Sequence, residues 1–117
     1  MKILINTVLL SVLLTGCSLW PRAHDPALAQ SFVTVKQDLQ EIDCTDTQTT
    51  GWNAIVKDAN WLREYTEFRN DPQKESAAGL VADLTRARGA SSAKVCGHWL
   101  ELSKKRLDVL NKAWSGR

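Results

Sequence analysis

The sequence lacks any apolar run long enough to span a bilayer. Its longest such run, residues 3–14, has about a dozen residues, whereas a membrane-spanning helix needs about 20. No segment alternates apolar and polar residues for long enough to form a β-strand, and there is no internal repeat or low-complexity tract. These absences argue against a permanent membrane span, a β fold and a repeat protein.

Residues suited to catalysis or metal binding are also scarce. Of two histidines, only His98 lies in a predicted helix, three residues before Glu101. Carboxylate-bridged metal sites in helical bundles use Glu-x-x-His on two helices, whereas this pair is single and in reverse order. The glycines are scattered and form no phosphate-binding loop. We therefore expect a protein that is not an enzyme and holds no metal.

The charges are nearly balanced, with 15 Lys and Arg against 13 Asp and Glu and a net charge of +2. This balance argues against nucleic acid as a partner. A basic run, Lys104, Lys105 and Arg106, is typical of a solvated helix face and is alternatively a contact for anionic lipid. Arg106 falls near the apolar face of its predicted helix, where it would reach out to water or pair with an acid.

The N-terminal residues have the three parts of an export signal. Lys2 supplies the positive charge, and the apolar run follows it. Small residues then lead directly into a cysteine, in the order Leu14-Thr15-Gly16-Cys17. This motif resembles the cleavage box of bacterial lipoprotein precursors, and the resemblance covers the first 17 residues.

The resemblance implies cleavage before Cys17, attachment of a diacylglyceryl group to its thiol and acylation of its amine, for example by palmitate. A triacylated cysteine anchors a protein stably, because each buried CH₂ contributes about 0.8 kcal/mol. Ser18, where inner-membrane lipoproteins commonly have Asp, implies the outer membrane, with the protein facing the periplasm. The chain then divides into a signal peptide (1–16), a lipidated tether (17–24) and a helical domain (25–117), with the covalent lipid in place of any cofactor.

Apolar residues recur at helical spacing through the rest of the chain. Asp25 before Pro26 signals a helix start, because Asp accepts hydrogen bonds from free backbone N–H groups and Pro has none to lose. Asp71-Pro72 repeats this signal, and Gly89 is expected to end a helix in the left-handed conformation. With short connections, the pattern predicts an all-α, up-and-down four-helix bundle with helices at about 26–43, 47–68, 72–88 and 92–115.

Two cysteines, Cys44 and Cys96, remain beside the lipidated one. In an up-and-down bundle the first helix ends where the fourth begins, so both cysteines lie at the end far from the anchor. Because exported compartments are oxidising, we predict a disulfide between them, worth roughly 4 kcal/mol in the loop-entropy description. The turn at 69–73 and the tail at 114–117 then lie at the opposite end, near the lipid.

Tryptophan is in excess, with five in the chain. Trp52, Trp99 and Trp114 lie on the apolar stripes of their helices, which predicts core positions. Three aromatic residues of the second predicted helix project from a separate face. Either that helix buries both faces against two neighbours, or the second face is an exposed patch that binds a partner. These three residues are Trp61, Tyr65 and Phe68.

The mature part also has a weaker resemblance to small helical lipoproteins of tailed phages. It is carried by segments 24–27, 68–73 and 114–117 and implies an envelope role during infection. Our leading hypothesis is a non-enzymatic outer-membrane lipoprotein that faces the periplasm and binds another envelope protein. The alternatives are a pilotin-like chaperone for a secretin and a phage-related lipoprotein of lysis or superinfection exclusion.

Overall fold

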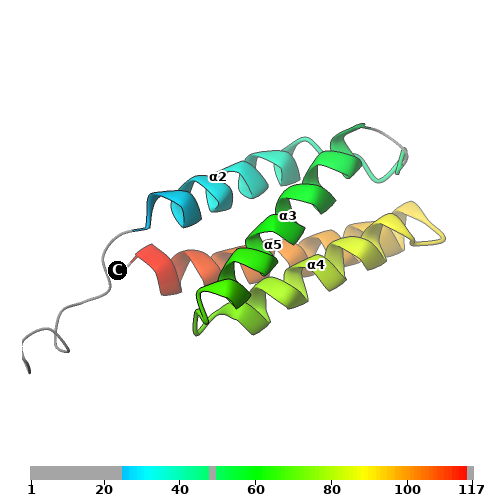
Figure 1. The fold of residues 1–117 in the computed structure, drawn as a ribbon. Helices are drawn as coiled ribbons and strands as arrows, with labels where there is room; N and C mark the ends of the chain where they lie inside the picture. The colour runs from blue at the N-terminus through cyan, green and yellow to red at the C-terminus, as the bar shows by residue number, and fades with distance from the viewer. Residues whose placement is uncertain (1–24, 48–49, 116–117) are drawn as a thin grey trace, which may run out of the picture.

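A computed structural model describes residues 25–47 and 50–115 as a bundle of four α-helices (Figure 1). There is no β-strand in these two ranges, and the all-α expectation is confirmed. Cys17 and the boundaries of the signal peptide and tether lie outside the described residues. The helices are α2 (Pro26–Gln40), α3 (Thr50–Phe68), α4 (Lys74–Arg88) and α5 (Ala93–Ser115).

Each helix packs against the next one in the chain: α2 against α3, α3 against α4, and α4 against α5. The chain direction reverses at every connection, and α3 crosses the other helices obliquely (Figure 1). The predicted up-and-down topology is therefore confirmed. Within the described part of the chain, none of the helices combines the length and the apolar character that a bilayer crossing requires.

Side-chain caps begin two of the helices, and the first of them is the Asp25 cap that the sequence predicts. The Asp25 carboxylate accepts hydrogen bonds from the backbone N–H groups of Ala27 and Leu28, at 3.1 and 3.2 Å. Ser92 Oγ accepts from the N–H of Val95 at 3.2 Å. These bonds satisfy donors that have no partner inside the helix, so each cap fixes where its helix starts.

Three predicted boundaries and one predicted conformation are wrong. The second helix begins at Thr50 rather than near 47. The first helix ends at Gln40 rather than near 43, because the Asp43 carboxylate accepts from the N–H of Thr45 and forms a turn. Asp71 likewise forms a turn by accepting from the N–H of Gln73 at 2.8 Å, so α4 begins at Lys74. Such local side-chain bonds compete with the helix.

The left-handed residue is also not the expected one. Gly89 follows α4 with φ −85°, in the ordinary right-handed range. Asn70 has φ 48°, at the turn between α3 and α4. Asn tolerates this conformation better than most residues with a side chain, because its short polar group bonds locally.

The apolar stripe of α3 forms the centre of the core. Helical spacing in the sequence predicts five residues on this stripe, and all five are buried: Trp52, Ile55, Ala59, Leu62 and Thr66. The stripe of α5 was predicted less well, because helical spacing indicated these residues: Val95, Cys96, Trp99, Leu102, Ser103, Leu110, Ala113 and Trp114. Val95 is exposed, Leu107 is buried although it was not in the predicted stripe, and Trp114 is only half-buried.

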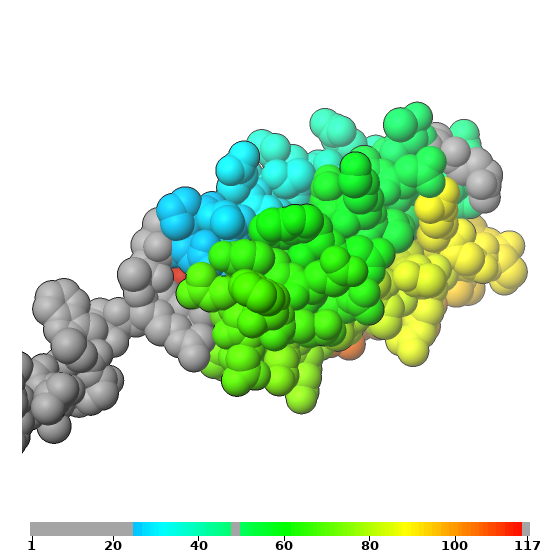
Figure 2. Space-filling view, viewed as in Figure 1, coloured from blue at the N-terminus to red at the C-terminus, as the bar shows by residue number. Residues whose placement is uncertain are grey.

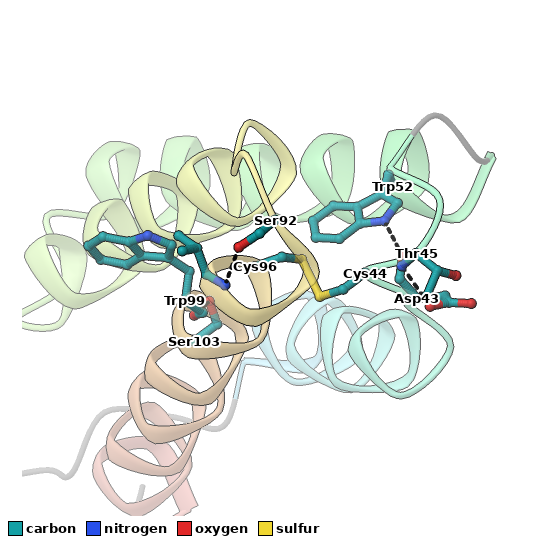
Figure 3. The surroundings of a disulfide bond; sticks show 9 residues. Asp43, Cys44, Thr45, Trp52, Ser92, Cys96, Trp99 and Ser103 are labelled. Atoms are coloured by element: carbon teal, nitrogen blue, oxygen red, sulfur yellow. Dashed lines mark hydrogen bonds between the residues drawn. A yellow bond between two sulfur atoms is a disulfide. The ribbon is translucent and has the colours of Figure 1, made fainter.

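The two ends of the bundle are closed differently. At one end Cys44 and Cys96 form the predicted disulfide, with their Cα atoms 5.8 Å apart. The indole of Trp52 lies beside it and donates to the Asp43 carbonyl at 3.0 Å (Figure 3). At the other end the start of α2, the 69–73 turn and the end of α5 come together, as the topology predicts.

Candidate functional site

Of the three aromatic residues predicted to form a second face of α3, Trp61 and Phe68 project outside the core, whereas Tyr65 is half-buried against it. Trp61 is 46% exposed and stacks on Tyr65, with ring centroids 4.8 Å apart and an interplanar angle of 11°. Phe68, at the end of the helix, is 84% exposed. We call these three residues the α3 aromatic surface. In Figure 2, the C-terminal half of α3 (green) lies beside the start of α2 (blue) on the visible face.

Tyr65 differs from its two neighbours because it also holds the structure together. Its hydroxyl donates to Asp25 Oδ2 at 2.7 Å, and Arg69 lies 3.3 Å from the same oxygen. The hydrogen bond from Tyr65 lowers the pKa of the Asp25 carboxyl, and the same bond raises the pKa of the phenol. Tyr65 therefore ties α3 to the first turn of α2, whereas Trp61 and Phe68 are free to meet a partner.

A cavity that sequence reasoning missed opens between α2 and α5. Its volume is about 370 Å³, and its apolar wall includes Leu28 and Val33. Phe32 of α2 and Trp114 of α5 meet edge-on across it, with centroids 5.9 Å apart and an interplanar angle of 87°. The Trp114 Nε1–H donates to Asp71 Oδ1 at 3.3 Å, which fixes the indole at this place.

A second, smaller cavity of about 170 Å³ continues along the same two helices. Phe32, Lys36 and Asn111 line both cavities, so the two are adjoining parts of one groove. Leu39 and Leu107 line its far part. We call the two cavities together the α2–α5 groove. Because α2 and α5 are not consecutive in the chain, no local sequence pattern marked the space between them.

The basic run predicted as a contact for anionic lipid does not form one surface. Lys104 is exposed and lies 3.3 Å from Glu101, and Lys105 is also exposed. Arg106 instead turns toward α4, where its Nε donates to the buried carboxylate of Asp83 at 2.5 Å. Of the two alternatives for Arg106, the pairing with an acid is the one observed.

The Asp83 carboxylate is a buried charge that the apolar pattern of α4 did not reveal. Arg106 and Arg86 both contact it, and Arg86 also lies over the ring of Trp99 at 4.9 Å. Gly79 leaves room for the Arg106 guanidinium, because a Cβ there would come within 2.4 Å of its Nη1. A buried charge needs such partners, so this cluster joins α4 to α5 and is not available to a ligand.

A pair of carboxyl groups faces across α2 and α3. The pKa of Asp38 is raised to about 7, mainly by burial and then by Asp58 and Glu41 nearby. Asp38 Oδ2 is buried and accepts no hydrogen bond from an N–H group or a hydroxyl in the described part of the chain. A proton shared with Asp58 removes the repulsion between the two groups.

Metal and catalytic arrangements were not expected. In residues 25–47 and 50–115, no three His, Cys, Asp or Glu side chains are grouped so as to hold a metal ion. The exposed ring of His98 rests edge-on against Trp99, with centroids 5.5 Å apart. Searches of protein-family models, curated proteins and solved structures found no match to this chain.

Proposed function

We propose that this chain is a lipid-anchored, non-enzymatic binding protein of the outer membrane that faces the periplasm and holds another envelope protein. The observation that carries the proposal is the α3 aromatic surface. Trp61 and Phe68 project from one helix at 46% and 84% exposure, although large aromatic side chains are normally covered. Burial of such side chains contributes strongly to protein–protein affinity.

The position of this surface agrees with a lipid anchor at Cys17. Asp25, the first described residue, lies at the end of the bundle where α3 ends, and Arg69 contacts it. A tether of residues 17–24 spans at most about 28 Å when fully extended. A partner embedded in or attached to the same membrane is therefore within reach of Phe68.

The proposal is tested by cross-linking intact envelopes that contain the full chain and identifying the proteins captured. We expect Trp61→Ala and Phe68→Ala to lower the yield of one defined envelope protein several-fold, since each removes exposed apolar area from the contact. Val95→Ala is the matched control, because Val95 is exposed but lies at the disulfide end. Tyr65→Ala is not used, because it would also break the bond to Asp25.

Unchanged capture of the same protein by Trp61→Ala and Phe68→Ala would contradict a role of the α3 aromatic surface. The identity of the captured protein also separates the related hypotheses. A secretin subunit would favour the pilotin-like alternative, and a wall hydrolase or phage receptor would favour the phage-related one.

A further inference from the structure

The α2–α5 groove is a long apolar surface that no helix of the described residues covers. We propose that it binds an amphipathic helix of the partner protein, with an apolar stripe toward the groove and acidic residues along the flank next to α2. The inference rests on the proposed function, because it names the segment by which the partner is held. It adds a second contact beside the α3 aromatic surface.

The helix order leaves this side of the bundle open. α2, α3, α4 and α5 pack in sequence, whereas α2 and α5 make few backbone contacts with each other. Side chains of α2 and α5 nevertheless belong to the same core cluster. The space between the two helices is therefore a surface groove with packed core residues at its base. An amphipathic helix docks into this kind of groove by burying one stripe of side chains.

Among the buried apolar residues of the described ranges, only those at this groove keep more than 1% of their surface exposed. Three core residues keep some exposure: Leu28 at 8%, Leu39 at 6% and Leu107 at 5%. Every other buried apolar residue is exposed by 1% or less. Each of these three partly exposed leucines lines one of the two cavities. The floor of the groove is thus the part of the core that an additional helix would finish burying.

The charges of the groove favour an acidic flank on the side of α2. Lys36 lines both cavities and makes no ion pair with the described residues. The other α2 residues along the groove carry no charge, apart from the cap Asp25, which Tyr65 and Arg69 already engage. On α5, Lys104 is already paired with Glu101, and Asp108 lines the smaller cavity from the side opposite α2. A carboxylate on the docked helix would therefore meet Lys36.

The openness of the groove also favours a helix over an acyl chain. The cavities lie along the outside between two helices, and Val33 at their edge is 49% exposed. A helix can bury one apolar stripe there and keep its other faces in water. An acyl chain has no polar face to present to water.

The test uses the full chain and a fluorescent helical peptide of about 18 residues, or five turns. The peptide carries a leucine stripe with glutamates along one flank, and a matched peptide has lysine in place of each glutamate. Fluorescence anisotropy measures binding. We expect the glutamate peptide to bind about fivefold more tightly, because of the pairing with Lys36.

Paired variants locate the site. Val33→Asn should weaken the glutamate peptide about tenfold, since an apolar contact is lost. Val109→Asn should have no effect, because Val109 is similarly exposed, at 52%, but lines neither cavity. Lys36→Glu should reverse the preference between the peptides, whereas Lys57→Glu, on an exposed face of α3, should not. Urea unfolding confirms that each variant is folded.

Equal effects of Val33→Asn and Val109→Asn would overturn the groove as the site, and equal binding of the two peptides would overturn the acidic flank. A Val33-dependent dimer, or a Val33-dependent fatty-acid complex without peptide binding, would overturn the helix as occupant. If the peptide fails while Trp61→Ala still reduces envelope capture, only this inference falls. If the peptide binds as expected while Trp61→Ala and Phe68→Ala leave capture unchanged, only the α3 aromatic surface falls.

Discussion

The two ends of this bundle are closed by different means. At one end a covalent bond between Cys44 and Cys96 ties the segment after α2 to α5, beside the buried ring of Trp52 (Figure 3). At the other end polar contacts of Asp25 and Asp71 do the joining. The comparison shows that closure is strongest at the end away from the larger cavity and weakest beside that cavity.

The contacts at the polar end are weak because they are exposed to solvent. Arg69, which contacts Asp25 at 3.3 Å, has a side chain that is 53% exposed, so water and salt screen the ion pair. The Trp114 bond to Asp71 is long, at 3.3 Å. Contacts of this kind can yield when a ligand enters, whereas the disulfide holds α2 and α5 in place at the other end.

Removal of the disulfide should break the strong end and have the largest effect on stability. Cys44→Ser with Cys96→Ser should lower the free energy of unfolding by about 4 kcal/mol, because the link closes a loop with a sequence separation of 52. Urea unfolding measures this value. The unsubstituted chain in reductant is the matched control and should behave alike. If the free energy of unfolding fell by less than about 1 kcal/mol, the disulfide would contribute little to stability. Non-covalent contacts would then close both ends of the bundle.

Loss of the Asp25 carboxylate should weaken the polar end of the bundle and lower its stability by about half as much as loss of the disulfide. Asp25→Ala should lower the free energy of unfolding by about 2 kcal/mol, from one helix cap and one hydrogen bond. Asp25→Asn keeps a capping oxygen and should lose less. Because the pKa of Asp25 is lowered, its contribution is present above the unfolded pKa and is lost as the pH falls through the folded one. If the free energy of unfolding of the alanine variant fell at acid pH as it does in the unsubstituted chain, this assignment would be contradicted.

Substitution of Asp38, at the α2–α3 interface between the two ends, should give the smallest change in the free energy of unfolding. This change should be a gain rather than a loss. Its pKa of about 7 lies above the unfolded value of 3.8, so the folded state loses stability as the pH rises between them. Asp38→Asn should therefore raise the free energy of unfolding by about 1 kcal/mol at pH 8, after allowance for solvent screening. Asp108→Asn, at an exposed position, is the control. A gain of equal size at pH 4 would exclude a charge effect.

The features predicted correctly are those that local spacing or chain order controls. The Asp25 cap depends on adjacent residues, the buried stripe of α3 depends on helical periodicity, and the Cys44–Cys96 disulfide follows from short connections. Burial of Asp83 was not predicted, because its partner Arg106 is distant in the chain. Val95 has the spacing of the α5 stripe but is 42% exposed, whereas its neighbour Cys96 is buried, so periodicity alone did not separate the two.

The sequence by itself therefore determined the four helices, their order and the pairing of the two cysteines. Each of these depends on interactions within about one turn or on the reversal of direction at a short loop. Only the tertiary structure decided that Trp61 and Phe68 are exposed and that the α2–α5 side is open. The physical reason is that these outcomes depend on how helices cross, and crossing is set by side-chain packing between segments far apart in the chain.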